Sequence, residues 1–399
     1  MILCDEEKRK VIELRRDIHR HPEISFEETR TSERIREVLG GLSGVEILDF
    51  PVSTGVVAVL TGTRSGKESS RPEKNGKLIR EIALRADIDA ISQTEKTDVA
   101  WRSETPGVMH ACGHDCHTAA LLGAAMALSR CRGRFSGQVD FVFQPAEEIT
   151  RGAEAMIGAG LFSSIHPDRM FGLHNWPTVP AGKIVVQEGP RMAAKINFRI
   201  TIQGRGGHGS EPQNNIDPIV CAAAVVQSLQ TIVSRNIDPM DNVICSVNSI
   251  RGGSEQNLVV DDVVMTATIR AIQQDALERA WERAGTILRS VSEAYSCGVE
   301  IVVEDRIPSV SNPPMLFEEA ERIACEAAGR ENVCQVPPAL ASEDFSFYMQ
   351  EVPSWFFWVG SGAPGGNSAP LHSPQFCPEE SVLAVSAELY AAAALCSLS

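Results

Sequence analysis

Apolar residues recur at helical spacing in two stretches near the start of the chain, one around Leu14 and one around Ile35. Pro22 lies between the two stretches, at a point where it would break a continuous helix. The pattern therefore predicts two separate helices within the first 40 residues.

After these helices, short apolar runs alternate with further helical patterns. Strands that alternate with helices are typical of an α/β domain with a mostly parallel sheet. The sequence therefore predicts that fold class for the larger part of the chain. The expected strands are 56–60, 82–84, 139–143, 170–173 and 355–359, and the expected helices are 117–129, 317–328 and 379–398.

The pattern changes in the middle of the chain. One strand is followed by a helix, two strands, a second helix and a last strand, which is the order of a split βαβ unit. We therefore expect a small α+β domain at 191–304, inserted into a larger domain formed by 1–190 and 305–399. Its elements are predicted at 195–202, 217–235, 243–247, 263–269, 276–295 and 299–303.

Composition narrows the range of partners. The 399 residues carry a formal net charge of −15, which argues against nucleic acid and membrane surfaces as partners. Apolar stretches such as 119–128 are too short to span a bilayer, and no signal-peptide pattern is visible. The 11 cysteines are an odd number, so we expect free thiols and a cytoplasmic location. The polar stretch 61–77 is expected to be a surface excursion.

The densest chemical feature is the segment 109–117, which holds three histidines, two cysteines and an aspartate. Alternate residues of an extended segment point the same way, so the Cys112 thiol and the His114 imidazole can face one metal ion. Two other interpretations remain. The segment could be a polar loop that caps the following helix through Asp115, or a zinc knuckle, for which the chain lacks a second ligand pair.

Carboxylates and histidines also follow other apolar runs. Glu147 and Glu148 come directly after the expected strand 139–143, at the end where open α/β sheets place their sites. One carboxylate could bind metal while the other takes a proton from water. His174 ends another apolar run, and His372 lies in a proline-rich loop. A solvated glutamate pair and structural histidines are the ordinary alternatives.

Taken together, these segments supply one thiolate, one carboxylate and three imidazoles. That set suits two divalent metals about 3.5–4 Å apart that share one bridging ligand. The candidate ligands are Cys112, His114, Glu148, His174 and His372.

Three candidate substrate contacts lie in the predicted small domain. His208 follows a glycine-rich loop that lacks the Lys-Ser/Thr ending of a phosphate-binding loop. Asn257 lies in a second polar, glycine-rich loop. Arg270 ends a predicted strand, either as an ordinary surface residue or as a fork that binds a substrate carboxylate.

These motifs together resemble the dimetal amidohydrolase/carboxypeptidase family, in its branch of aminoacylases, hippurate hydrolases and auxin-conjugate hydrolases. The Cys-Gly-His-Asp text at 112–115 is specific to this branch, because many relatives have aspartate in the bridging place. The matching segments are 14–23, 83–90, 106–115, 144–148, 172–177, 206–208, 216–219, 342–345 and 371–372.

The resemblance implies a role for each candidate. Cys112 would bridge two metals, Glu147 would be the general base, and Asp87 or Asp89 would orient an imidazole ligand. The inserted domain would be a lid that supports a homodimer or a higher homo-oligomer. In many relatives the lid histidine, here His208, steadies the oxyanion across the dimer. Asn257 and Arg270 match positions that contact the substrate carboxylate in some relatives.

The implied activity is metal-dependent hydrolysis of the amide bond of small N-acyl amino acids, with a dipeptidase or carboxypeptidase as the alternative. Manganese or zinc is the favoured metal, with nickel or cobalt as further candidates. The chain departs from the family after Ala90, after His208 and after Asn257, which affects the expected substrate preference rather than the metal chemistry.

Two interpretations from other classes compete with this one. A non-catalytic metal-binding protein on the same fold would have lost Glu147 or a ligand, and this chain retains them. A thiol enzyme would use Cys112 or Cys116 with a nearby histidine, and a chelator would spare its activity.

Overall fold

The computed structural model describes residues 2–64, 80–254, 256–363 and 368–399, so most of the predicted excursion 61–77 lies outside the described residues. The chain divides into two compact units. The first unit comprises Met1–Gly189, Ser311–Val336 and Phe347–Ser399. The second comprises Pro190–Val310 and Pro337–Ser346, so it includes a return segment that lies outside the expected range 191–304.

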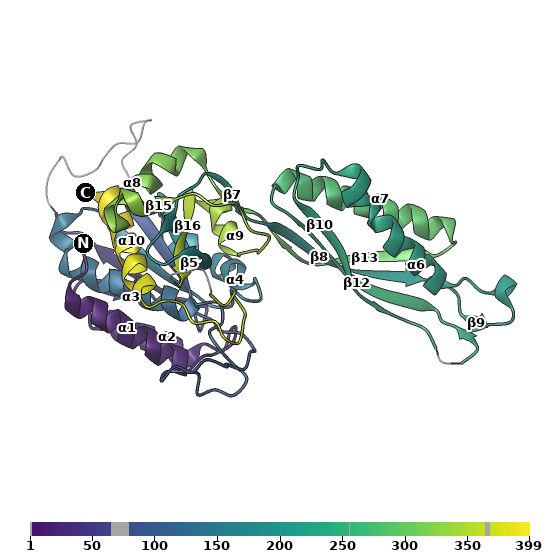
Figure 1. Cartoon of the computed structure of the whole chain (residues 1–399), viewed down its shortest axis with the longest axis horizontal. Coiled ribbons are helices and arrows are strands. Elements are labelled where there is room, and N and C mark those ends of the chain that lie inside the picture. Colours follow the sequence, from purple (N-terminus) through teal and green to yellow (C-terminus); the bar gives the residue numbers. More distant parts are fainter. Residues whose placement is uncertain (1, 65–79, 255, 364–367) are drawn as a thin grey trace. The chain divides into compact units, whose positions relative to one another are not determined.

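A sheet of eight strands forms the centre of the first unit (Figure 1). Its four middle strands, β4, β3, β5 and β16, run parallel, and antiparallel strands flank them, which confirms the prediction of a mostly parallel sheet. In sheet order the strands are β1 (Val45–Ile47), β2 (Val56–Thr61), β4 (Gln138–Gln144), β3 (Glu81–Asp87), β5 (Arg169–Pro180), β16 (Ser354–Gly362), β6 (Ile184–Val185) and β15 (Val333–Cys334).

The main core of this unit lies on one face of the sheet. Alternate strand residues, such as Ile82, Leu84 and Ala86, join apolar residues of α1, α2, α3, α8 and α10 in a single buried cluster. On another side of the unit, α4 contacts β4. The helices are α1 (Asp5–Arg20), α2 (Thr29–Gly40), α3 (His114–Arg130), α4 (Gly152–Gly158), α5 (Leu161–Ser164), α8 (Phe317–Ala328), α9 (Phe345–Glu351) and α10 (Ser381–Leu398).

The sequence pattern indicated only apolar stretches too short to span a bilayer, and helix α10 is longer than these stretches. Among the described residues, α10 alone is long and apolar enough to cross a membrane, yet 78% of it is buried inside the protein. It packs against α3, α8 and β16. Its apolar surface is therefore explained by its place in the core.

The second unit is an antiparallel sheet with helices α6 and α7 packed on it, and the predicted order of its elements is confirmed (Figure 1). The expected helix 217–235 is shorter in the structure. The α-helix α6 ends at Leu229, and a π-helical turn follows at Ile232–Asn236. The elements are β8 (Ala194–Gln203), β9 (Gly207–His208), α6 (Pro218–Leu229), β10 (Val243–Arg251), β11 (Leu258–Val259), β12 (Asp262–Ala271), α7 (Gln274–Ala294) and β13 (Gly298–Ile307). Strands β7 (Gly189–Met192) and β14 (Val310–Asn312) form a separate pair.

The parallel strands bring distant chemical segments to one edge of the large sheet. Asp87 at the end of β3 pairs with Gln144 at the end of β4. On the next strand, β5, His174 lies beyond the residue that pairs with Arg85. Because parallel strands end at the same edge, the loops that follow them meet there, as expected for the site of an α/β sheet.

Asp140 is a buried carboxyl group in the middle of β4. Burial, together with the neighbouring Glu81 carboxylate, raises its pKa to about 9, and Gln138 donates a hydrogen bond to it at 2.8 Å. An unfolded aspartate has a pKa of about 3.9. The folded protein therefore retains a proton on Asp140 that the unfolded chain releases, and the contribution of this group to stability falls as pH rises from about 4 to about 9.

We expect Asp140→Asn to remove this titration and to gain stability relative to the unsubstituted protein as pH rises. The gain is at most about 1.4 kcal/mol per pH unit. Urea unfolding at about pH 5, 7 and 9 measures it. Exposed Asp98 offers the matched control Asp98→Asn. A constant difference between Asp140→Asn and the unsubstituted protein across this range would contradict the assignment.

Candidate metal centre

Gly113 sets the geometry of the loop before α3. Its φ of 94° is in the left-handed region, and a Cβ atom there would lie 2.4 Å from Nδ2 of Asn175. That nitrogen donates a hydrogen bond to the backbone oxygen of Cys112 at 2.8 Å. Only glycine fits between these groups, so Gly113 allows the loop to lie against β5 with Cys112 and His114 on either side of it.

A first group of donor atoms comprises the Cys112 thiol and the His114 and His174 imidazoles. All three residues are buried, and their ligand atoms lie within 4.8 Å of one another. The Sγ atom of Cys112 is 3.3 Å from Nε2 of His174. The Nδ1 atom of His174 donates to the backbone oxygen of Asn175 at 2.6 Å, which leaves the Nε2 lone pair directed at the thiol.

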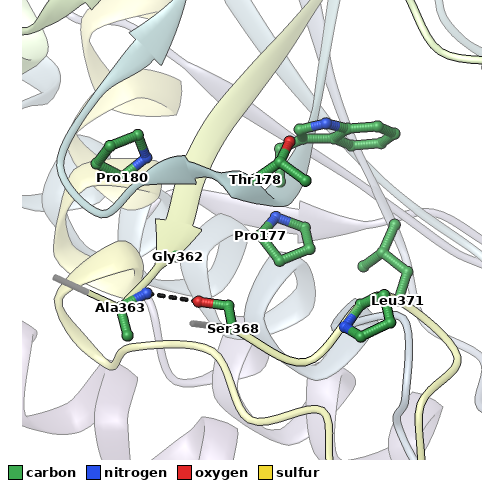
Figure 2. Close-up of a pocket in the computed structure, with 9 residues that line it drawn as sticks. Pro177, Thr178, Pro180, Gly362, Ala363, Ser368 and Leu371 are labelled. Carbon is green, nitrogen blue, oxygen red and sulfur yellow. Dashed lines mark hydrogen bonds between the residues drawn. The ribbon is translucent and has the colours of Figure 1, made fainter. Parts of the chain in front are cut away.

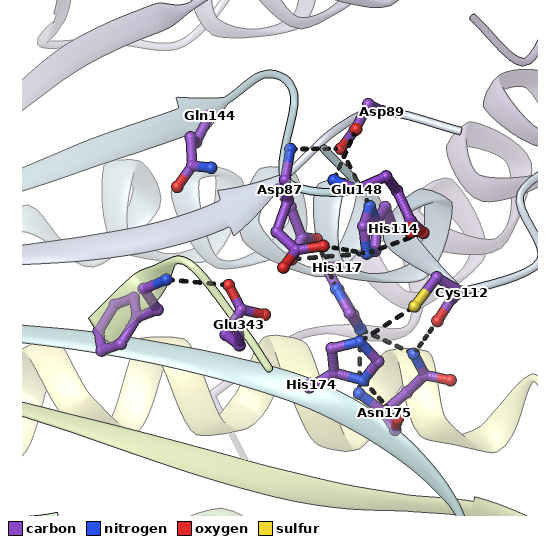
Figure 3. A network of polar contacts seen from close by, with 12 residues as sticks. Asp87, Asp89, Cys112, His114, His117, Gln144, Glu148, His174, Asn175 and Glu343 are labelled. Atoms are coloured by element: carbon purple, nitrogen blue, oxygen red, sulfur yellow. Dashed lines mark hydrogen bonds and ion pairs between the residues drawn. The ribbon is translucent and has the colours of Figure 1, made fainter. Parts of the chain in front are cut away.

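A second group of donor atoms also includes Cys112. Its thiol, the Glu148 carboxylate and the His372 imidazole lie within 4.8 Å of one another, and Glu148 Oε2 is 3.3 Å from His372 Nε2. His372 has a φ of 63°, and its backbone N–H donates to Ala111 at 2.8 Å. The fold thus brings all five predicted ligands together as two groups of three that share Cys112. Figure 3 shows four of them, Cys112, His114, Glu148 and His174.

Asp89 holds the adjacent glutamates in place. Its Oδ1 atom accepts a hydrogen bond from the backbone N–H of Glu147 at 3.1 Å, and its Oδ2 atom accepts one from Glu148 at 3.0 Å. Ala146, with a φ of 55°, turns the chain after β4 so that these two N–H groups face Asp89. Asp89 Oδ1 also lies 3.2 Å from His114 Nδ1, which leaves Nε2 of that ring for a ligand.

His117 is a site residue that the sequence-based ligand set does not include. Its Nδ1 lies 2.6 Å from Asp87 Oδ1, and its Nε2 accepts the backbone N–H of Asn175 at 2.9 Å. Asp87 and Asp89 therefore each orient an imidazole, His117 and His114 respectively. The spacing of three residues between His114 and His117 places both rings on one face of α3, and that spacing is visible in the sequence.

Asp115 does not cap helix α3, which corrects one alternative interpretation of the 109–117 segment. Its buried carboxylate accepts a hydrogen bond from Arg15 Nε at 2.7 Å and lies 2.8 Å from His19 Nδ1. Burial opposes the charged carboxylate, but Arg15 and His19 hold the pKa of Asp115 well below its usual value. The interaction fixes helix α1 against the start of α3.

Burial shifts the acidic donors toward their protonated forms. Burial raises the pKa of the Cys112 thiol, and the Glu148 carboxylate raises it further. Burial also raises the pKa of Glu148 to about 7. Burial and the nearby His117 ring lower the pKa of His174, so that this imidazole is neutral and able to bind metal.

Two buried atoms in the centre lack hydrogen-bond partners among the described residues. They are Nε2 of His114 and Oε1 of Glu148, and they lie 3.9 Å apart. A cation between them would satisfy both atoms, and the donor set of thiol, carboxylate and imidazoles suits a divalent ion. The Glu147 carboxylate lies beside them, 3.8 Å from the same His114 nitrogen. The residues present therefore fit metal.

The three candidates for substrate contact all belong to the second unit. His208 on β9 pairs with Leu258 on β11 in a small antiparallel sheet, and Asn257 directly precedes β11. His208 Nδ1 accepts the backbone N–H of Ser210 at 3.1 Å. Arg270, on β12, donates to the backbone oxygen of Leu340 at 2.9 Å and contacts Ser342 Oγ at 3.3 Å.

Comparison with known proteins identifies the family of this chain. The profile described as Peptidase family M20/M25/M40 matches residues 83–395. The chain belongs to this family. N-acetylcysteine deacetylase of Bacillus subtilis (strain 168) is 36% identical over 383 residues, which cover 96% of this chain and 95% of the relative.

Two other comparisons give the same picture. Thermostable carboxypeptidase 1 of Saccharolobus solfataricus is 36% identical and covers 96% of this chain and 93% of its own length. A dinuclear metal-binding M20 peptidase from Bacillus subtilis superposes with a TM-score of 0.82 at 33% identity, with 99% of each chain covered. The predicted family is confirmed, and as a member the protein is a hydrolase of amide bonds with a site for two divalent metals.

In this M20 enzyme, His117 is expected to position the metal ligands without binding metal. His117→Leu removes the link between Asp87 and the backbone beside His174, so metal affinity should fall by roughly tenfold to a hundredfold. His117→Gln can still donate to Asp87 and accept from Asn175, and it should recover part of the loss. Calorimetric titration of the metal-free protein with cobalt measures this, with Cys112→Ser as a control that removes a candidate ligand. Unchanged affinity in His117→Leu would exclude the positioning role.

Proposed function

We propose that the protein hydrolyses the amide bond of N-acyl amino acids, giving a carboxylic acid and a free amino acid. The observation that carries this proposal is the pair of donor groups that share Cys112, with the Glu147 carboxylate beside them. The similarity to an N-acetylcysteine deacetylase along nearly the whole chain supports an N-acyl amino acid as substrate.

We propose that Cys112, His114 and His174 would hold one metal and that Cys112, Glu148 and His372 would hold the other. The assignment rests on the grouping of the donor atoms. Thiolate, imidazole and carboxylate ligands together favour manganese or zinc, with nickel or cobalt as alternatives.

Divalent cations at this centre would lower the pKa of water and polarise the amide carbonyl. The residues of the chain supply the proton transfer. Glu147 accepts a proton from the attacking water and passes it to the leaving nitrogen. Asp89 holds the backbone of Glu147 at 3.1 Å, so that this carboxylate remains beside the donor groups without being one of the proposed ligands.

The second unit is proposed to act as a lid and as the contact surface of a homodimer or higher homo-oligomer. Exposed His208 would donate to the oxyanion, and Asn257 and Arg270 would bind the substrate carboxylate. All 11 cysteines are free, which fits the proposed cytoplasmic location.

A dipeptidase or carboxypeptidase activity is the second candidate, and the similarity to thermostable carboxypeptidase 1 favours it. The two candidates differ in the group on the acyl side of the bond. A dipeptide carries a charged amino group there, whereas an N-acyl amino acid carries none. Each variant described below is therefore tested on an N-benzoyl amino acid and on a dipeptide with the same C-terminal residue.

Glu147→Gln should lower kcat by about 10²–10⁴, the usual contribution of a general base, because the amide cannot accept a proton. Its metal content should stay close to that of the unsubstituted enzyme. Glu148→Gln, the matched control one residue away, should lose metal. Steady-state kinetics and metal analysis of both variants give the answer. Loss of metal in Glu147→Gln with retention in Glu148→Gln would reverse the two roles.

Substitutions of Arg270 and His208 should affect different kinetic constants. Arg270→Ala should mainly raise KM for N-acyl amino acids, because it removes a partner of the carboxylate, while His208→Ala should mainly lower kcat. If His208 reaches the site of a partner subunit, mixing His208→Ala with Glu147→Gln should restore activity, since one site of the hybrid has both groups. Failure to restore activity, with subunit exchange confirmed, would rule out a role across the dimer.

A further inference from the structure

A pocket of about 410 Å³ lies in the first unit (Figure 2). It opens between the last part of β5, the end of β16 and the loop that leads to His372. Lining residues include Trp176, Thr178, Pro180, Gly362, Pro370 and Leu371. The proposed assignment of metal ligands gives this pocket no role.

One wall of the pocket continues the strand face that carries a proposed ligand. Side chains alternate along the regular part of β5, so His174 and Trp176 lie on the same face. The Trp176 ring meets the His174 ring edge to face, with 5.8 Å between centroids. Its position is fixed by stacking on Trp358 at 3.8 Å. The indole therefore contacts a proposed metal ligand and also lines the pocket.

The opposite wall also ends at a proposed ligand. Pro370 and Leu371 immediately precede His372, whose backbone is fixed by its hydrogen bond to Ala111 at 2.8 Å. The floor is fixed by glycine in β16, where a Cβ atom on Gly362 would lie 2.4 Å from the backbone oxygen of Pro177. Trp176 on one wall thus contacts the His174 ring, and Leu371 on the other adjoins His372 in the chain, so the pocket lies next to two imidazoles of the metal centre.

The chemistry of the lining selects an uncharged ligand. No charged side chain lines the pocket among the described residues, which are Trp, Pro, Thr, Gly, Ala, Ser and Leu. A carboxylate or an ammonium group would lose its hydration there without gaining a partner. Pockets of about 300–1,000 Å³ hold small molecules, so this volume exceeds the needs of an acetyl group.

We infer that this pocket binds the acyl group of the substrate and selects bulky apolar acyl groups, such as benzoyl or medium-chain acyl, over acetyl. The inference rests on the proposed function and narrows its substrate class. Trp176 and Leu371 contact the part of the acyl chain nearest the scissile bond, and Thr178 and Pro180 contact its far end.

The test compares acyl groups on one amino acid. The metal-loaded enzyme is given N-acetyl, N-hexanoyl, N-octanoyl and N-benzoyl derivatives, and kcat/KM is measured for each. Each methylene group moved from water into an apolar pocket favours binding by roughly fourfold. We therefore expect kcat/KM to rise by at least about tenfold from acetyl to octanoyl or benzoyl.

Thr178→Trp should fill the far end of the pocket. Thr178 is exposed, so the larger side chain can enter the pocket without disturbing the core. The preference for octanoyl over acetyl should fall by at least about tenfold. Thr63→Trp is the matched control, because Thr63 is also exposed and follows β2, whose last residue pairs with Gln138 at the opposite end of β4.

Inhibition by the free acids provides a second measurement. Octanoate should inhibit the unsubstituted enzyme and Thr63→Trp more strongly than acetate does, and Thr178→Trp should lose this difference. A flat or acetyl-preferring profile, or equal profiles in both tryptophan variants, would overturn the acyl pocket and leave the proposed function standing. No hydrolysis of any N-acyl amino acid by the metal-loaded enzyme would overturn the proposed function and the pocket together.

Discussion

The metal centre depends on one carboxylate, that of Asp89. Its two oxygens accept the backbone N–H groups of Glu147 and Glu148, and one of them also faces His114. Because a single rigid group holds three functional residues, the two adjacent glutamate side chains are fixed in different surroundings. In a flexible loop, two consecutive glutamates would both sample several positions, and neither carboxylate would be fixed in the place that its role requires.

The buried carboxylates next to the candidate ligands are paired with basic side chains. Asp87 lies between His114 and His117, and Asp115 is neutralised by Arg15 and His19 on α1. A buried carboxylate without such partners would cost several kcal/mol or take up a proton. This arrangement explains why the first helix of the chain carries charged residues that are fully buried, and it ties the N-terminal segment to the centre.

Strand β5 connects the metal centre with the apolar pocket. One face of this strand carries His174 and then Trp176, so the donor groups and the apolar pocket follow each other along a single extended segment. A charged centre and an uncharged pocket are therefore held at a fixed spacing by backbone geometry. That spacing suits a substrate whose amide bond separates an apolar acyl group from a charged amino acid.

The sequence by itself determined much of this protein. Apolar periodicity placed the strands of the large sheet and the helix–strand order of the second unit, because burial on one face imposes the period of each element. The residue types of the candidate ligand set were also readable, since few chemistries need Cys112, His114, Glu148, His174 and His372 together. The family resemblance added the roles that spacing alone left open.

Only the tertiary structure decided how these residues divide and what supports them. The sharing of Cys112 by two donor groups depends on where β4, β5 and the loop at His372 meet. The link from Asp87 through His117 to Asn175 joins three segments that lie far apart in the sequence. Asp115 resembled a helix cap in the sequence, yet it binds Arg15, 100 residues away. Contacts of this kind arise from the packing of distant elements, which no local pattern encodes.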